Sequence, residues 1–205
     1  MSIINQLATS LQRRDEVPNI ELAKLIANKN DKKAVRELID LLTKKNKDIQ
    51  HDCIKVLYEI GYIKPSLISE YANTFIPLLE HKNNRLQWGA MIALSTITPQ
   101  MPEIIYDLLP KIMAAGNKGS VITKDNCVNI LIHLCSIKNY EDDAFALLNE
   151  MLMNSPTNQL PMYAERALPI INAKNKAQFI KTLTSRLPEI EKETKRKRVE
   201  KVIKK

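Results

Sequence analysis

The sequence predicts an all-α chain built from stacked helix pairs, and three observations support this. Four short apolar stretches, 53–60, 90–97, 127–134 and 164–171, repeat one pattern at a constant spacing of 37 residues. Inside each stretch the apolar positions follow the 3.6-residue period of a helix and do not alternate as in a strand. The chain also has only 4 Gly among 205 residues and no strand-like run between turns. A fixed period of about 20 to 50 residues is typical of stacked repeats, in which each unit has an apolar face that it cannot bury alone.

Four positions of the pattern stay apolar in all four copies and are the predicted core. They hold Leu57, Leu94, Leu131 and Leu168; Ile60, Ile97, Leu134 and Ile171; Cys53, Ala90, Cys127 and Ala164; and Val56, Ala93, Ile130 and Ala167. The other half of each unit carries a second helical stripe on the same spacing, which includes Ala34, Tyr71, Leu108 and Phe145. Each unit is therefore predicted to be two helices.

The predicted elements form one domain over residues 1–205. Residues 1–30 are an N-terminal cap of two shorter helices, 31–172 are four 37-residue repeats, and 173–205 are a C-terminal pair with a basic tail. Turn residues separate the helices within and between repeats. The predicted pairs are 31–44 with 47–62, 66–82 with 84–97, 102–115 with 120–136, 141–154 with 159–172, and 175–187 with 189–204.

The second helices resemble those of HEAT repeats. The segments Ile49-Gln50-x-x-Cys53-x-x-Val56-Leu57-x-x-Ile60-Gly61 and Leu86-Gln87-x-x-Ala90-x-x-Ala93-Leu94-x-x-Ile97 carry this likeness, and Ile76-Pro77-Leu78-Leu79 is similar to the proline-kinked first helix. The resemblance covers about residues 31–172 and implies a right-handed α-α superhelix, a HEAT-like (armadillo-like) solenoid. The chain departs from the family where an Arg usually follows the leading aliphatic residue of the second helix; Gln50, Gln87, Lys124 and Pro161 stand there. Such arrays serve many functions, so surface residues must indicate which.

The net charge of +8 is concentrated at the C-terminus. Between 192 and 205 there are eight Lys or Arg and two Glu, which leaves the other residues with a formal charge of only +2. The run Lys195, Arg196, Lys197 and Arg198 is a candidate contact for nucleic acid or another acidic surface. Apolar residues on the same segment favour the alternative, a solvated capping helix whose basic residues complement the helix dipole.

The sequence offers no catalytic or metal-binding constellation, and we expect no cofactor. His51, His81 and His133 lie in different predicted helices without a ligand-spaced partner, and the chain has no Cys-x-x-Cys. Neither a secretory signal nor an apolar run of about 18 residues is visible, so we expect no membrane span. The 3 Cys are expected to be core thiols, which agrees with a cytoplasmic, reducing compartment.

The side of the second helices opposite the core stripe is the candidate partner-binding face. In HEAT arrays these helices line the concave surface, so the family resemblance implies a groove there. Several residues on this face are large or apolar where a monomer would favour polar groups, which is typical of a partner site. The candidate partner-binding residues are Tyr58, Tyr62, Trp88, Ile92, Asn129, Ile132, Met162 and Arg166.

Three functions follow from these features. The first is a non-enzymatic scaffold that binds another protein or a peptide in the groove. The second, implied by resemblance, is a nucleic-acid-binding relative of the HEAT-like alkylpurine DNA glycosylases, with Trp88, Asp125 and Arg166 as groove residues. Two features argue against this second function. That family has an Asp one turn after its groove Trp, whereas Ile92 stands there in this chain, and the groove has few cations to neutralise phosphates. The third is a subunit whose apolar row is covered permanently by a partner or a second copy.

Overall fold

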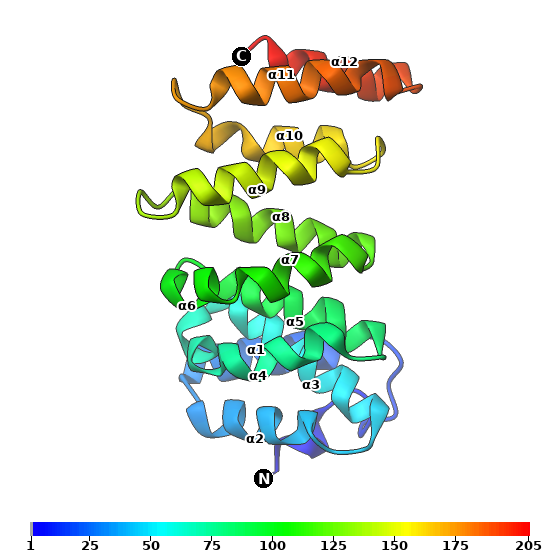
Figure 1. Ribbon diagram of the computed structural model, residues 1–205. Helices are drawn as coiled ribbons and strands as arrows, with labels where there is room; N and C mark the ends of the chain where they lie inside the picture. Colours follow the sequence, from blue (N-terminus) through cyan, green and yellow to red (C-terminus); the bar gives the residue numbers. More distant parts are fainter. Residues whose placement is uncertain (1) are drawn as a thin grey trace. The chain divides into compact units, whose positions relative to one another are not determined.

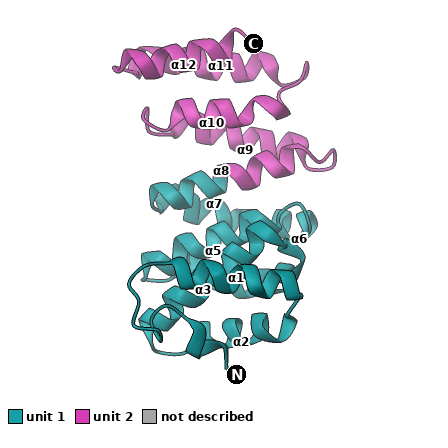
Figure 2. Cartoon of the chain, turned by 180° about the vertical axis from the view of Figure 1, so that it is seen from behind, with its two compact units in different colours: residues 1–127 teal, residues 128–205 magenta. Residues whose placement is uncertain are grey.

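The computed structural model describes residues 2–205, and the regular structure in this range is entirely helical. The chain divides into two compact units, unit 1 up to Cys127 and unit 2 from Val128 to Lys205 (Figure 2). The boundary lies within a helix, α8 (Val121–Cys135). Organisation as one domain over 1–205 stays a prediction.

Unit 1 contains two layers of helices (Figure 1). Its elements before α8 are η1 (Ile3–Gln6), α1 (Val17–Lys29), α2 (Lys32–Leu42), α3 (Lys47–Ile63), η2 (Pro65–Leu67), η3 (Ser69–Tyr71), α4 (Ala72–Phe75), η4 (Ile76–Glu80), α5 (Asn84–Ile97), α6 (Pro102–Asp107) and α7 (Leu109–Lys118). Helix α3 packs between α1 and α5, while α2 packs on α3 and η4 packs on α5. We call α1, α3, α5, α8, α10 and α12 the B helices, because those within the repeats are the second helix of a pair.

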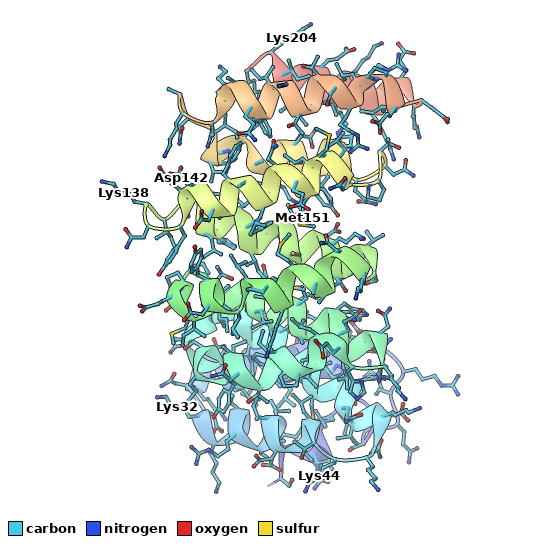
Figure 3. The ribbon with its side chains drawn as sticks, in the orientation of Figure 1. Lys32, Lys44, Lys138, Asp142, Met151 and Lys204 are labelled. Carbon is cyan, nitrogen blue, oxygen red and sulfur yellow. The ribbon has the colours of Figure 1, made fainter. Side chains whose placement is uncertain are left out.

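Unit 2 continues the pairing with α9 (Glu141–Asn154), α10 (Leu160–Ala167), η5 (Leu168–Ile170), α11 (Lys176–Arg186), η6 (Leu187–Glu189) and α12 (Glu193–Ile203). Helix α10 packs on α12, and α9 packs on α11. Asp142 at the start of α9, labelled in Figure 3, forms an ion pair with Lys174 at 2.5 Å, in the connection before α11. An ion pair as well as packing therefore joins the α9–α10 pair to the α11–α12 pair.

The start of the B helix is fixed in three repeats by a polar side chain at one repeat position. Asn46 Oδ1 accepts from the backbone N–H of Ile49 at 3.2 Å, and Asn83 Oδ1 accepts from that of Arg85 at 3.0 Å. Ser120 Oγ accepts from the N–H of Thr123 at 3.3 Å. These three residues follow the 37-residue spacing, and each satisfies one of the unpaired N–H groups of a helix N-terminus.

Three of the four residues at the position where HEAT repeats usually have an Arg donate hydrogen bonds to carbonyls at the end of the preceding helix. Gln50 donates to the carbonyl of Leu42 and Gln87 to that of Leu79, both at 2.7 Å. Lys124 donates to the carbonyl of Asn117, also at 2.7 Å. Helix C-terminal carbonyls have no partner within their own helix, so each donor satisfies a group that would otherwise lack one.

Pro161, at the equivalent position of the fourth repeat, has no hydrogen-bond donor in its side chain. Arg186 of α11 donates instead to the carbonyls at the end of α9. The Arg186 guanidinium, only 6% exposed, donates to the carbonyls of Leu152 at 2.8 Å and Ser155 at 2.9 Å, and also to that of Met153. Its Nε donates to Glu189 at 2.8 Å. We call these donors, Gln50, Gln87, Lys124 and Arg186, the carbonyl-capping residues.

The predicted core positions are buried in the first three repeats. Leu57, Leu94 and Leu131 are 0% exposed. Two other positions of the pattern are 0% exposed in all four repeats, and they hold Cys53, Ala90, Cys127 and Ala164, and Val56, Ala93, Ile130 and Ala167. Leu168 and Ile171 are half-buried instead, since Pro169 ends helix α10 at Ala167. A proline cannot donate the backbone bond that would continue the helix.

Two helix predictions are wrong in their continuity, and a proline lies beside a break in each. The segment predicted as one helix over 66–82 forms η2, η3, α4 and η4, and Pro77 lies at the start of η4. The helix predicted over 102–115 is divided into α6 and α7 at Leu108, beside Pro110. The two shorter helices predicted for the N-terminal cap are the 3-10 helix η1 and the α-helix α1.

A glycine allows α3 and α5 to approach closely. A Cβ at Gly89 would lie 2.6 Å from Cγ1 of Ile54. We expect Gly89→Ala to lower the free energy of unfolding by about 1–3 kcal/mol through overpacking, although Ala favours a helix over Gly by roughly 1 kcal/mol. Urea denaturation of a double-mutant cycle checks this. In an Ile54→Ala background the substitution should lose its cost, and an equal cost in both backgrounds would contradict the explanation.

Candidate functional site

Three aromatic side chains meet on the B helices of unit 1. The rings of Tyr58 and Tyr62 on α3 contact edge to face, with centroids 6.2 Å apart and planes at 82°. The Trp88 ring on α5 lies 5.9 Å from that of Tyr58, tilted by 55°. Such offset and T-shaped arrangements add to the free energy of simple burial. We call Tyr58, Tyr62 and Trp88 the aromatic cluster.

The members of the aromatic cluster differ in exposure. Tyr62 is 61% exposed and Trp88 is half-buried, so both present surface to solvent. Tyr58 is 5% exposed and Ile92 is 6% exposed, so the prediction that these two contribute exposed surface is wrong. A B helix in the middle of the layer is flanked by neighbours of the same layer as well as by the other layer, so its free face is narrower than half of the helix. Tyr58 therefore supports Trp88 and Tyr62 from beneath.

Lys55 lies against the aromatic cluster and is already paired. Its ammonium is 4.8 Å from the Tyr58 ring centroid and forms ion pairs with Glu59 at 2.7 Å and Glu16 at 3.0 Å. Burial lowers the pKa of Lys55, but hydrogen bonds with Glu59, Tyr58 and Glu16 outweigh that effect and leave the pKa raised. Burial likewise raises the pKa of Tyr58. Both side chains therefore keep their protons at neutral pH, and the cation is part of the scaffold rather than a free contact.

The N-terminal segment contributes a cavity that the sequence prediction missed. A cavity of about 450 Å³ lies between residues 8–19 and the first turns of α3 and α5, and its lining is mostly polar. Buried Asp52 holds this segment in place, since it accepts from the backbone N–H of Thr9 and from Asn19 Nδ2, both at 2.7 Å. We call it the N-terminal cavity. The charged run at 13–16 could have indicated this cavity, but the sequence prediction assigned residues 1–30 only to a cap.

In unit 2 the predicted groove residues lie on α8 and α10. Arg166 Nη1 donates to Asn129 Oδ1 at 3.2 Å, so two residues at the same repeat position are joined. Ile132 and Met162 are half-buried, and Arg166 is exposed. These residues present a mixed polar and apolar surface within unit 2, and their role in binding stays a prediction.

The four basic residues predicted as a contact for acidic surfaces have partners within unit 2. Lys195 donates to Asn158 Oδ1 at 2.6 Å, and Arg196 donates to the carbonyl of Ile190 at 2.7 Å. Lys197 pairs with Glu193 at 2.7 Å. These bonds favour the capping-helix interpretation of α12.

Arg198 completes this set through a bidentate pair. Its Nε and Nη2 donate to the two carboxylate oxygens of Glu165 on α10, at 2.8 and 2.5 Å. The hydrogen bonds from Arg198 are the main reason that the pKa of Glu165 lies below its usual range. Arg198 thus joins α12 to α10, on which α12 also packs.

The cysteines are buried, and burial raises the thiol pKa of Cys53, Cys127 and Cys135 to about 12. They stay protonated at neutral pH and are weak nucleophiles. Within residues 2–205, no three His, Cys, Asp or Glu side chains gather in a way that could hold a metal ion. None of the helices that the structure describes combines the length and apolarity needed to cross a membrane.

Comparison with known proteins shows the fold. No family model matches the chain, and no curated protein matches it. A designed armadillo repeat protein in complex with the peptide (KR)4 is similar at 14% identity with a TM-score of 0.65, over 90% of this chain and 85% of that one. Computationally designed armadillo repeat proteins for modular peptide recognition are similar at 15% identity, with a TM-score of 0.62 over the same shares.

An engineered protein covers the whole chain and 97% of its own length, at 19% identity and a TM-score of 0.60. At such identities the likeness concerns the fold alone. The chain is an all-α solenoid of the armadillo or HEAT-like type, as the 37-residue spacing predicts.

Proposed function

We propose that the chain is a non-enzymatic scaffold that binds a protein or peptide along its B helices. The observation that carries this proposal is the aromatic cluster, in which Tyr62 and Trp88 stay accessible on top of buried Tyr58. Aromatic residues in a supported setting are the commonest anchors of protein interfaces, because they contribute large contact areas at a low entropic cost. In unit 2, Asn129, Ile132, Met162 and Arg166 are the proposed contacts.

The fold supports the same proposal. Helical repeats create extended surfaces on which successive units contribute one contact each, and the designed armadillo relatives are described as peptide binders. The aromatic cluster occupies two neighbouring B helices, so a peptide that crosses α3 and α5 would meet both Tyr62 and Trp88. The nucleic-acid alternative stays a prediction, and no observation of the structure favours it.

Tyr62→Ala and Trp88→Ala should each weaken binding to peptides selected by the wild-type protein by at least about tenfold, as for interface anchors. The peptides would come from a random display library, and dissociation constants would be measured by fluorescence anisotropy with labelled peptides. Met153→Ala is the matched control, because Met153 is 41% exposed on α9 and lies outside the proposed contacts. Circular dichroism would verify that each variant is folded.

Two outcomes would contradict the proposal. A wild-type protein that selects no peptide above background has no peptide-binding face of this kind. Selected peptides that bind Tyr62→Ala and Trp88→Ala as tightly as Met153→Ala would place the binding face elsewhere. Tyr58→Ala is unsuitable for this test, since removal of a side chain that is only 5% exposed would alter folding as well as binding.

A further inference from the structure

The second helix pair of unit 2 carries a surplus of positive charge. From Lys176 to Lys205, a range that includes α11 and α12, there are eleven Lys or Arg and four Glu, a formal side-chain charge of +7. Residues 128–175 of the same unit contain three Lys or Arg and five Asp or Glu, a charge of −2. Unit 2 therefore keeps +5 when all of its charged side chains are counted, and the surplus belongs to the α11–α12 pair.

Glu165 of α10 is paired with one cation of α12 and lies near others. Arg198 forms the pair. Hydrogen bonds from Arg198 are the largest cause that lowers the pKa of Glu165, and Coulombic attraction to Lys201 and Lys205 lowers it further. This carboxylate is outnumbered by the cations that it faces, so it does not neutralise this side of α12.

Three lysines form a row on the exposed side of α12. Lys197, Lys201 and Lys204 are spaced by four and three residues, so they lie on one face of the helix, and all three are exposed. Lys204 points away from the rest of unit 2 (Figure 3). Lys197 pairs with Glu193 at 2.7 Å, whereas Lys201 and Lys204 have no carboxylate within 4.0 Å among residues 2–205. We call these three residues the lysine row; at 1.5 Å of rise per residue it is about 10 Å long.

The exposed side chains from 191 to 205 include no apolar or aromatic group. Each of them is Lys, Arg, Glu or Thr, and Phe179, the one aromatic residue between 176 and 205, is only 1% exposed. Interfaces between proteins are depleted of Lys and centre on aromatic or apolar anchors. Interfaces with nucleic acid are more polar and much more positively charged. The composition of this surface therefore favours a nucleic acid over a protein.

The same composition distinguishes among polyanions. Single-stranded nucleic acid binds by stacking its bases on aromatic rings, and an amphipathic helix binds a membrane by inserting its apolar face. The apolar residues Val199 and Val202 of α12 are buried, and α12 packs on α10. A duplex requires neither kind of contact, because its phosphates lie on the outside, with one charge per about 1.7 Å of axis. Lysine ammoniums act as point charges, and phosphate contacts carry no sequence information.

We propose that the lysine row binds the phosphate backbone of a nucleic-acid duplex without sequence preference. This inference goes beyond the proposed function and does not rest on it, since the aromatic cluster belongs to unit 1. It also differs from the glycosylase-like alternative, because it involves neither a groove tryptophan nor a base. The bonds of Lys195 to Asn158 and of Arg196 to Ile190 fit this role, since they hold α12 in place while the lysine row faces solvent.

The test measures the binding of labelled duplexes of about 20 base pairs by fluorescence anisotropy, between about 50 and 200 mM salt. DNA duplexes of two unrelated sequences should bind within about twofold of each other, because phosphates are contacted and bases are not. Lys201→Gln with Lys204→Gln should reduce the slope of log K against log salt by about 1.8, since each lost phosphate contact removes about 0.9. It should also weaken binding at least about fivefold at the lowest salt. An RNA duplex of the same length is measured in parallel, and this dependence in either duplex supports the inference and identifies its source.

Two further variants separate the lysine row from charge and from folding. Lys44→Gln with Lys45→Gln removes the same charge from exposed positions after α2 in unit 1. This matched control should change the affinity less than about twofold, because charges outside the contact are screened. Lys201→Arg with Lys204→Arg should retain the affinity and the slope, since it keeps both charges. Circular dichroism would verify that each variant is folded.

Several results would overturn the inference. Equal losses in the two Gln double variants would reduce the attraction to net charge. A single strand bound as tightly as the duplex would exclude the preference for a duplex. An octapeptide of glutamate, or vesicles with about 30% phosphatidylserine, bound more tightly than either duplex at the same salt would place an acidic protein or a membrane on this surface instead. Failure of both duplexes to bind would overturn the inference and leave the proposed function to the display selection.

Discussion

Replacing Arg186 by methionine should lower the free energy of unfolding by about 2–6 kcal/mol, because two buried carbonyls lose their donor at about 1–3 kcal/mol each. The guanidinium is 6% exposed and serves the carbonyls of Leu152, Met153 and Ser155. Methionine has a similar volume but no donor. Each buried acceptor left without a donor costs about 1–3 kcal/mol. Ser155 Oγ still donates to the Leu152 carbonyl at 3.1 Å, so the loss falls mainly on the carbonyls of Met153 and Ser155, which accept from Arg186.

Urea denaturation followed by circular dichroism would measure this loss, and amide hydrogen exchange would locate it in α9 and α11. Lys181→Met is the control on the same helix, because Lys181 is exposed and the change should stay within about 0.5 kcal/mol. Arg186→Lys should lie between the two, since an ammonium keeps the charge but reaches fewer acceptors. A Met variant at position 186 that is as stable as the control would show that water replaces the guanidinium at these carbonyls.

Leu94→Ala should cost about 2–5 kcal/mol, as for other fully buried leucines that leave a cavity. Leu94 is 0% exposed at the start of the last turn of α5, and its neighbours in the helix, Ala93 and Met91, are 0% exposed as well. Trp88 lies on the same helix and is the single Trp of the chain, so its fluorescence reports the unfolding of unit 1 directly. Ile63→Ala is the control, because Ile63 is 46% exposed and should lose less than about 0.5 kcal/mol. A Leu94→Ala loss no larger than the control would contradict its place in the core.

The repeat spacing predicts the core well because burial in a stack is periodic. A position that is buried in one repeat is buried in the next when both helices continue, as Leu57 and Leu94 demonstrate. The prediction is wrong where a local residue ends the helix early. Pro169 is such a residue, and it leaves Leu168 and Ile171 half-buried although the spacing places them with the core.

The candidate site was less predictable than the core for two physical reasons. Helix periodicity identifies the side of a helix that faces its own partner, but it does not register the neighbours on either flank. Tyr58 and Ile92 therefore looked exposed and are buried. The second reason is that the N-terminal cavity depends on contacts between residues far apart in sequence, such as Thr9 with Asp52, which no local pattern reveals. The meeting of Tyr62 with Trp88 through Tyr58 is the part that the repeat spacing did indicate.

The carbonyl-capping residues have a consequence for the order in which the repeats can mature during synthesis. The first two repeats complete their bonds with Gln50 and Gln87, which belong to the same repeat as the carbonyls that they serve. Either repeat could be duplicated or moved as a cassette without losing these bonds. The fourth repeat depends on a donor that follows its last helix, so it stays incomplete until residue 186 has left the ribosome. Cutting the chain after residue 172 would make that incompleteness permanent.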